Sequence, residues 1–216
     1  MDDNVDEYSI STAWDITTSS YVGSFNVSAQ EPTPVATSFK PDGTVMYVIG
    51  VGNQTVYQYT LSTAWSVSTA SYASKSFSVA TQETNPWGLY FTPDGTKMFI
   101  IGEIGVDVNE YSLSTAWDVS TASYVQNFSV SGQTSLPYGL TFGNDGSKMY
   151  VVELTNDSIY QYSTATIPTI TYPTNITWPS GTAPTSPAIG ETDVITFTTR
   201  DGGTTYNAAL AIDGAT

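Results

Sequence analysis

Hydrophobic and polar residues follow a period-two pattern in short runs along most of the chain. Residues 88–92 and 97–102 are apolar, aromatic or β-branched, and they flank the pair Asp94-Gly95. This arrangement is typical of a β-hairpin, because glycine accepts the positive φ of a tight turn. Residues 108–113 alternate, and residues 124–130 form a fourth strand-like run. No stretch keeps a helical period, so the pattern predicts an all-β protein.

The strand-like runs belong to a tandem repeat. A motif that reads YSLSTAWD in its third copy starts at intervals of 51, 52 and 51 residues, at Tyr8, Tyr59, Tyr111 and, in shortened form, Tyr162. The Asp-Gly turn returns with a similar period, at residues 41–44, 93–96 and 144–147. Tandem four-stranded antiparallel units of this length predict the blades of a β-propeller.

The core of each unit resembles YVTN- and NHL-type propeller repeats. Residues 86–100 read PWGLYFTPDGTKMFI and residues 137–151 read PYGLTFGNDGSKMYV, with a looser copy at residues 34–48. The resemblance covers about residues 5–163 and implies a propeller fold. The units are longer than those families require, and the extra residues lie in an insert between the third and fourth strands.

The number of strands does not complete a ring. The repeats begin and end at a third strand, which predicts two, four, four and three strands in successive units. Because propellers usually close with four to eight blades, we expect a homo-oligomer that completes the ring. A segment of a longer protein, or a three-fold β-trefoil or β-prism, are the alternatives.

A second region follows the repeats. Prolines recur between residues 168 and 187, and proline is excluded from central strands. The residues after them predict one hairpin that turns at residues 201–203. We therefore expect a propeller-like domain over residues 1–164, and a Pro-rich linker with a small C-terminal β-hairpin domain over residues 165–216.

Charge and composition exclude several classes of protein. Twenty Asp and Glu stand against five Lys and Arg, the net charge is −15, and His and Cys are absent. The chain therefore has no basic surface for nucleic acid and no residues for a His-based triad, a thiol nucleophile or a His/Cys zinc site. No apolar run approaches the length of a membrane span. We predict no metal, no cofactor and no membrane insertion.

Residues 178–206 are similar to C-terminal segments of tail-fibre and other virion proteins of marine bacteriophages. Those proteins also carry Tyr-x-Leu-Ser-Thr-Ala-Trp-Asp repeats like the ones in this chain. The resemblance implies a non-enzymatic structural protein of a tail fibre, appendage or capsid decoration. Its location would be the virion or the extracellular space, and its partners other virion proteins and a host-surface carbohydrate. A secreted prokaryotic adhesin or filament subunit is one alternative. A carbohydrate-active enzyme that depends on Glu83 or Glu103 is the other.

Candidate binding residues lie where the repeats differ from one another. The loops between the fourth strand and the next first strand, and between the second and third strands, reach the same edge of a propeller. Amides and aromatic rings together suit a sugar, so we predict a ligand site at Gln82, Glu83, Trp87, Glu103, Gln133 and Tyr138. Residues repeated in register are interpreted as structural: Trp14, Trp65 and Trp117 as packing residues, and Asp42, Asp94 and Asp145 as turn residues.

Overall fold

The computed structural model describes residues 3–155, 157–163, 174–179, 181 and 192–215. In this part of the chain the regular elements are strands, apart from the short 3-10 turns Ile16–Thr18, Val67–Thr69 and Val119–Thr121. The predicted all-β class is therefore confirmed. The chain forms two compact units, Met1–Gly143 with Met149–Tyr162, and Asn144–Lys148 with Ser163–Thr216. The predicted domain boundary after residue 164 lies outside the described residues.

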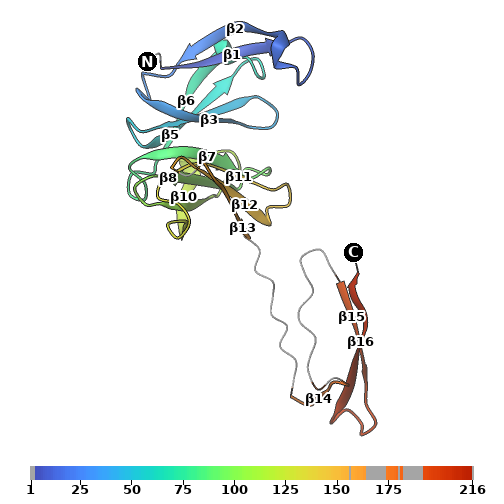
Figure 1. Cartoon of the computed structure of the whole chain (residues 1–216). Coiled ribbons are helices and arrows are strands. Elements are labelled where there is room, and N and C mark those ends of the chain that lie inside the picture. The colour runs from blue at the N-terminus through green and yellow to red at the C-terminus, as the bar shows by residue number, and fades with distance from the viewer. Residues whose placement is uncertain (1–2, 156, 164–173, 180, 182–191, 216) are drawn as a thin grey trace. The chain divides into compact units, whose positions relative to one another are not determined.

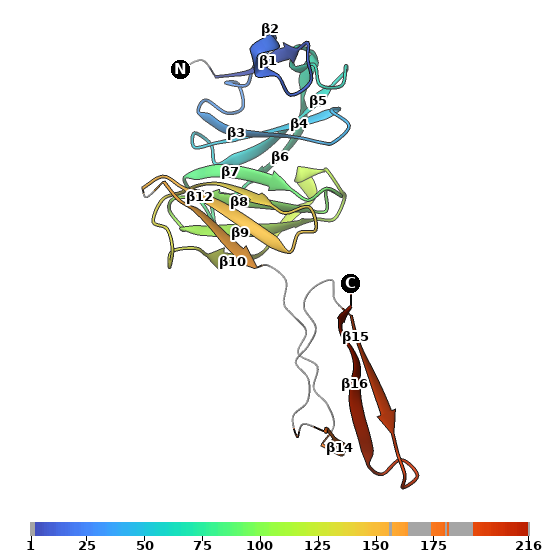
Figure 2. The ribbon, with the colours of Figure 1, turned by 45° about the vertical axis from the view of Figure 1, so that its right-hand side comes forward.

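The repeats fold into antiparallel sheets of two, four, four and three strands. Figures 1 and 2 show these sheets following one another in chain order. They consist of β1 (Asn4–Ile10) and β2 (Ser19–Asn26); β3 (Pro34–Phe39), β4 (Val45–Gly50), β5 (Thr55–Leu61) and β6 (Ala70–Ser78); β7 (Pro86–Phe91), β8 (Lys97–Gly102), β9 (Asp107–Leu113) and β10 (Ala122–Ser129); and β11 (Pro137–Phe142), β12 (Lys148–Glu153) and β13 (Ile159–Ser163). Each strand pairs with its neighbour in the chain. This is the architecture of an incomplete β-propeller, and it does not support the three-fold alternative.

The C-terminal hairpin is also confirmed. β15 (Thr192–Thr198) pairs antiparallel with β16 (Tyr206–Ala215), and β14 (Ile176–Thr177) adds a short parallel strand. In the turn, Asp201 Oδ1 accepts hydrogen bonds from the backbone N–H groups of Thr204 and Thr205, at 3.1 and 3.0 Å. An Asp side chain that binds its own turn stabilises this connection.

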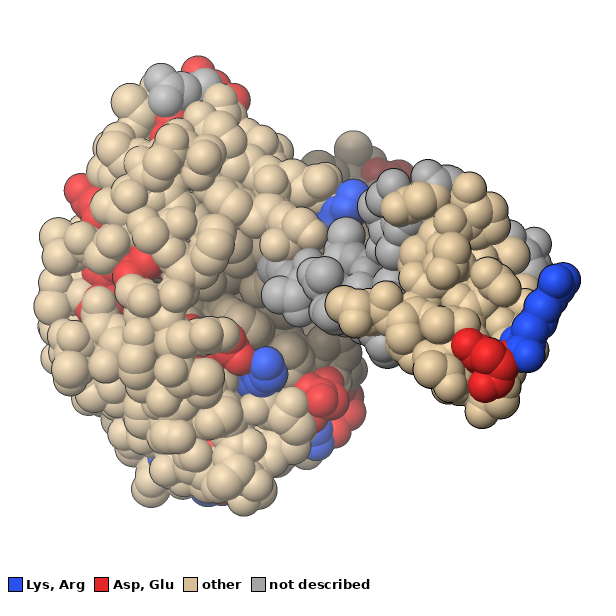
Figure 3. Space-filling view, turned by 90° about the horizontal axis from the view of Figure 1, so that it is seen from below, with Lys and Arg blue, Asp and Glu red and all other residues tan. Residues whose placement is uncertain are grey.

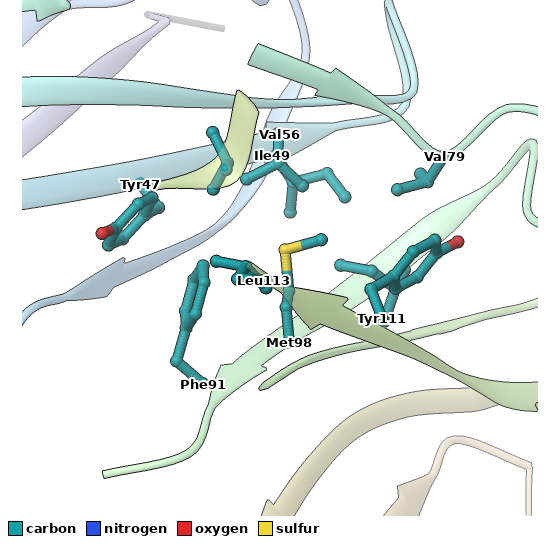
Figure 4. Close-up of a cluster of buried hydrophobic side chains, with 10 residues drawn as sticks. Tyr47, Ile49, Val56, Val79, Phe91, Met98, Tyr111 and Leu113 are labelled. Atoms are coloured by element: carbon teal, nitrogen blue, oxygen red, sulfur yellow. The ribbon is translucent and has the colours of Figure 1, made fainter. Parts of the chain in front are cut away.

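The core lies between successive sheets. Tyr47, Ile49 and Val56 of the β3–β6 sheet pack against Met98 and Tyr111 of the β7–β10 sheet, and all five are buried (Figure 4). Alternate side chains of a strand point to opposite faces. Both faces of a middle sheet are therefore buried, each against one neighbouring sheet.

The repeated Asp-Gly turns have the predicted structural role. Asp42, Asp94 and Asp145 each accept a hydrogen bond from the backbone N–H two residues later, at 2.9 to 3.1 Å. The glycine after each Asp has a φ between 71° and 73°, which the lack of a Cβ permits. The aspartates thus close their own hairpins.

The repeated tryptophans do not all pack. The Trp117 ring lies 5.7 Å from the Phe91 ring and 6.5 Å from the Tyr47 ring, measured between centroids. Trp65 contacts Phe39 at 5.6 Å but remains 54% exposed, and Trp14 is 98% exposed. The packing prediction is wrong for Trp14, because the β1–β2 sheet has no first hairpin beside its insert and no preceding sheet.

Candidate functional site

The first strands of neighbouring sheets lie next to one another. β7 packs between β3 and β11, and each of these strands is at one edge of its own sheet. We call the region that these three strands form the hub. Loops that precede the three strands, and loops that follow the second strand of each sheet, meet at one end of the hub.

Each hub strand carries a β-bulge at the residue after its proline. The pairing with the second strand skips Val35 in β3, Trp87 in β7 and Tyr138 in β11. A bulge bends the strand and changes the direction of a side chain, and bulges are frequent next to active sites. The same irregularity therefore positions a residue that differs in all three repeats, and in two of them it is a large aromatic residue.

The structure brings the two predicted aromatic residues together. The rings of Trp87 and Tyr138 stack with centroids 4.4 Å apart and planes 17° apart. The Trp87 Nε1 atom is buried, and it has no hydrogen-bond partner among the described residues. Buried indole N–H groups are usually paired, so this donor is an unmet polar group at the hub.

Glu103 is hydrogen-bonded to the loop that leads into Trp87. Its Oε2 accepts a hydrogen bond from Asn85 Nδ2 at 2.6 Å, and its backbone N–H donates to Asn85 O at 3.1 Å. Asn85 is two residues before Trp87. Glu103 is only partly buried, so a carboxylate held by an amide stands at the loop end of β7. The sequence analysis missed Asn85, although its place in the variable loop could have indicated it.

Glu83 has a different environment from Glu103. It is fully buried, and its carboxylate accepts hydrogen bonds from the backbone N–H groups of Asn85, Ile104 and Gly105, at 2.6 to 3.3 Å. Glu31 does the same one repeat earlier, for Thr33, Gly52 and Asn53. Each carboxylate therefore connects two loops. The oxygens of Glu83 are already hydrogen-bonded to backbone N–H groups, which indicates a structural role.

In the third repeat the carboxylate at this place comes from the end of β12 rather than from the loop before β11. Thr134 takes the place of Glu83, and Glu153 takes the place of Gly102. Thr134 Oγ1 donates to Glu153 Oε2 at 2.7 Å. A Cβ added at Gly102 would lie 2.3 Å from the carboxyl carbon of Glu83, so only one of the two positions can carry the longer side chain. Comparing the repeats pairwise could have revealed this exchange.

The two predicted glutamines occupy equivalent positions with different contacts. Gln133 Oε1 accepts a hydrogen bond from the Tyr162 hydroxyl at 3.3 Å, and burial raises the pKa of Tyr162. In the preceding repeat, the buried Tyr111 hydroxyl has no partner among the described residues. The backbone N–H of Gln82 donates to Val79 O at 2.9 Å. Ligand binding by the six predicted residues stays a prediction.

The charges near the hub loops are negative. The basic residues lie elsewhere: Lys40, Lys97 and Lys148 adjoin the Asp-Gly turns, Lys75 is on β6, and Arg200 is in the second unit. Figure 3 shows acidic and basic side chains scattered over a face that consists mostly of uncharged residues. No group of three or more acidic side chains within the described ranges is arranged to hold a metal ion. No helix there is long and apolar enough to cross a membrane.

Sequence comparison matches one family to most of the chain. The family described as "Lactonase, 7-bladed beta-propeller" matches residues 8–186. No curated protein matches the chain.

Solved structures share the fold at low identity. A candidate 6-phosphogluconolactonase from Bacteroides fragilis has 14% identity and a TM-score of 0.54, over 74% of this chain and 44% of that chain. A protein from Lactobacillus plantarum has 15% identity and a TM-score of 0.54, over 74% and 45%. A candidate 6-phosphogluconolactonase from Bacteroides uniformis has 14% identity and a TM-score of 0.50, over 72% and 46%. The chain thus spans less than half the length of the structures it matches.

The family match corrects two predictions. The interpretation as a structural virion protein of a bacteriophage is wrong, because the matching family is one of lactonases rather than of virion components. The prediction that the protein is not an enzyme is wrong for the same reason. The homo-oligomer and the extracellular location stay predictions.

Proposed function

The chain belongs to the lactonase family of 7-bladed β-propellers, whose sequence pattern matches residues 8–186, and from this premise we propose that it forms part of a lactonase that opens a sugar lactone at the hub. The observation that carries this proposal is the stacked pair of Trp87 and Tyr138, aimed by two β-bulges. Both residues are only partly buried, so their aromatic surface can pack against a lactone ring, and aromatic side chains are common in sites for small molecules.

Glu103 is the proposed general base. A partly buried carboxylate that one amide orients can accept a proton from water at neutral pH. The water oxygen then bonds to the lactone carbonyl carbon, the ring C–O ester bond breaks, and the proton passes to the released ring oxygen. The product is the open hydroxy acid, so the reaction consumes one water and needs no other reactant. Asn85 is the proposed positioning residue, through its 2.6 Å bond to Glu103 Oε2.

The charge distribution favours a lactone without a phosphate group. Lys97 lies at the far end of the hairpin from Glu103, a strand of six residues away, or about 20 Å at 3.3 Å per residue. This distance is more than twice the Debye length of about 8 Å at physiological ionic strength, so the Lys97 charge is largely screened at Glu103. Glu83, Glu103 and Glu153 lie at the near end. A phosphate dianion would therefore meet negative charge at the hub, unlike the uncharged sugar lactone.

Lactone hydrolysis by the purified chain tests this proposal. Acid release from gluconolactone should exceed the uncatalysed rate, and Glu103→Gln should lower kcat by roughly 100-fold, the usual contribution of a general base. Trp87→Ala should raise KM. Glu110→Gln, on β9 and paired with Lys97 at 2.7 Å, is the matched control and should keep the activity.

Two results would contradict the proposal. A rate no higher than the uncatalysed one, for gluconolactone and for its 6-phosphate, would refute lactonase activity. Faster hydrolysis of the 6-phosphate would leave the activity standing and refute the preference for an uncharged lactone.

A further inference from the structure

The first and last sheets of the repeats expose apolar side chains at positions that the middle sheets bury. Tyr8 of β1 is 59% exposed, whereas the equivalent Tyr59 and Tyr111 are fully buried. Ile159 of β13 is 68% exposed, whereas the equivalent Val108 is 4% exposed. The middle sheets thus show which contacts the first and last sheets of the repeats do not make.

The interface between the two middle sheets shows how these positions are covered. One side of the β3–β6 sheet contributes Ile49 and Val56, and we call this side of a sheet its leading face. The facing side of the β7–β10 sheet contributes Tyr111, Leu113 and Val119, and we call this side the trailing face. Figure 4 shows side chains from both faces meeting in one cluster. A leading face and a trailing face together make a closed apolar interface.

Among the described sheets of the repeats, none packs on the trailing face of the β1–β2 sheet. Its residues Tyr8, Ile10 and Ile16 occupy the positions of Tyr111, Leu113 and Val119, and they are exposed. Isolated exposed apolar residues are ordinary, but a set that matches a buried interface indicates a contact surface.

Among the described sheets of the repeats, none packs on the leading face of the β11–β13 sheet. Val152 and Ile159 occupy the positions of Ile49 and Val56, and they are 46% and 68% exposed. The first and last sheets of the repeats therefore carry the two complementary halves of the interface that the middle sheets form with each other.

We propose that two copies of this chain associate head to tail into a closed ring. The leading face of β12 and β13 in one copy packs against the trailing face of β1 and β2 in the other, and a second identical contact closes the ring. The matched part of the chain corresponds to 44% and 45% of the length of two solved structures with this fold. Two copies, with four sheets of the repeats each, therefore supply close to the length of one complete propeller and form a ring of eight sheets, within the usual range of four to eight blades. A closed arrangement leaves neither face open.

The proposed contact does not depend on lactonase activity, but it affects the hub. In one copy β3, β7 and β11 form only an arc. The hub strands of a second copy would face this arc across the ring axis, so the loops that carry Trp87 and Glu103 would border an enclosed space rather than open solvent.

Light scattering coupled to size exclusion tests the association. The particles should have twice the mass of one chain, which is 23.1 kDa, and Ile16→Glu or Ile159→Glu should each shift the protein toward the monomer. Val125→Glu is the matched control, because Val125 on β10 is 49% exposed and lies on neither end face. Circular dichroism of each variant should show an unchanged β spectrum; if Ile159→Glu does not fold, Val152→Glu examines the same face.

Mixing the two variants distinguishes head-to-tail packing from other dimers. A mixture of Ile16→Glu and Ile159→Glu chains retains one intact pair of faces, so dimers should reappear in the mixture although neither variant dimerises alone. A monomeric wild-type chain, an open filament of higher mass, or a dimer that survives both substitutions would overturn the proposal.

Discussion

Two glutamates of the same repeat show how local contacts separate structural from chemical roles. Glu83 is buried, with three backbone N–H groups around its carboxylate, whereas Glu103 is partly exposed and held by one amide. Burying a carboxylate without hydrogen-bond donors would cost free energy, so these three hydrogen bonds explain why the fold can bury Glu83. The residue type is the same, but the environment gives Glu83 a structural role and leaves Glu103 available for the proposed chemistry.

Replacing Glu83 with Gln should destabilise the repeats. The amide group of Gln would direct N–H donors toward backbone N–H groups, so we expect the free energy of unfolding to fall by about 3 kcal/mol, the order of a lost bond to a charged group and an unmet donor. Urea unfolding followed by fluorescence measures this change.

Glu103→Gln is the control for that measurement. It retains an oxygen that can accept from Asn85, so its loss should stay below about 1 kcal/mol. Equal losses for the two variants would contradict the assignment of Glu83 as the structural carboxylate.

At the scale of the element, the Asp-Gly hairpin and the insert form one assembly. The backbone N–H of Trp117 donates to Gly95 O at 3.0 Å, and a Cβ on Gly95 would lie 2.3 Å from the indole ring. Trp65 has the same relation to Gly43. Glycine is therefore required twice in these hairpins, for its positive φ and for the close approach of the ring.

Gly95→Ala should cost more stability than Gly146→Ala. Both residues have a φ of 71°, and an L-residue there costs roughly 1–2 kcal/mol. Only Gly95 meets an indole, since nothing lies within 4 Å of a Cβ at Gly146. We expect a total loss of about 3 kcal/mol or more for Gly95→Ala, with overpacking added to strain. Thermal and urea unfolding of both variants provide the comparison, and equal losses would refute the role of the indole.

At the scale of the whole molecule, ionisation is governed by carboxylates and tyrosines, because the sequence has no histidine. Hydrogen bonding to Lys40 lowers the pKa of Asp42 to about 2, and the Thr92 hydroxyl lowers the pKa of Asp94. Burial raises the pKa values of Tyr47, Tyr59 and Tyr111. Folding therefore favours ionised aspartates and protonated tyrosines.

The melting temperature should be constant from about pH 5 to pH 9 and should fall on both sides. Stability from a lowered carboxyl pKa is present above the ordinary value near 3.9 and is lost as the pH falls toward 2. Stability from a raised tyrosine pKa is present below about pH 10 and is lost above it. Thermal unfolding between pH 2 and pH 11 measures the decrease in melting temperature at both low and high pH.

One substitution tests whether Asp42 contributes to the fall in melting temperature at low pH. Asp42→Asn should make the decrease below pH 4 shallower, because one carboxylate with a lowered pKa is removed. A step in the melting temperature between pH 5 and pH 8 would contradict this account of the titrating groups.

Much of the fold could be predicted because its signals are local. The alternation of side chains, the Asp-Gly turns and the period of the Tyr-x-x-Ser-Thr-Ala-Trp motif act over a few residues, and they indicated the strands, their order and the incomplete ring. The exposure of Trp14 was missed, because a repeat implies the same packing in every copy. The first copy lacks the neighbouring sheet that would cover it.

The sequence by itself determined the all-β repeat, its unequal strand count and the absence of histidine and cysteine chemistry. Only the tertiary structure decided that Trp87 stacks on Tyr138, that Glu83 is enclosed by backbone, and that Asn85 holds Glu103. These residues come from different loops and sheets, and their distances depend on how bulged strands meet at the hub. Local patterns carry no information about such distances, because they are fixed by the packing of one sheet on the next.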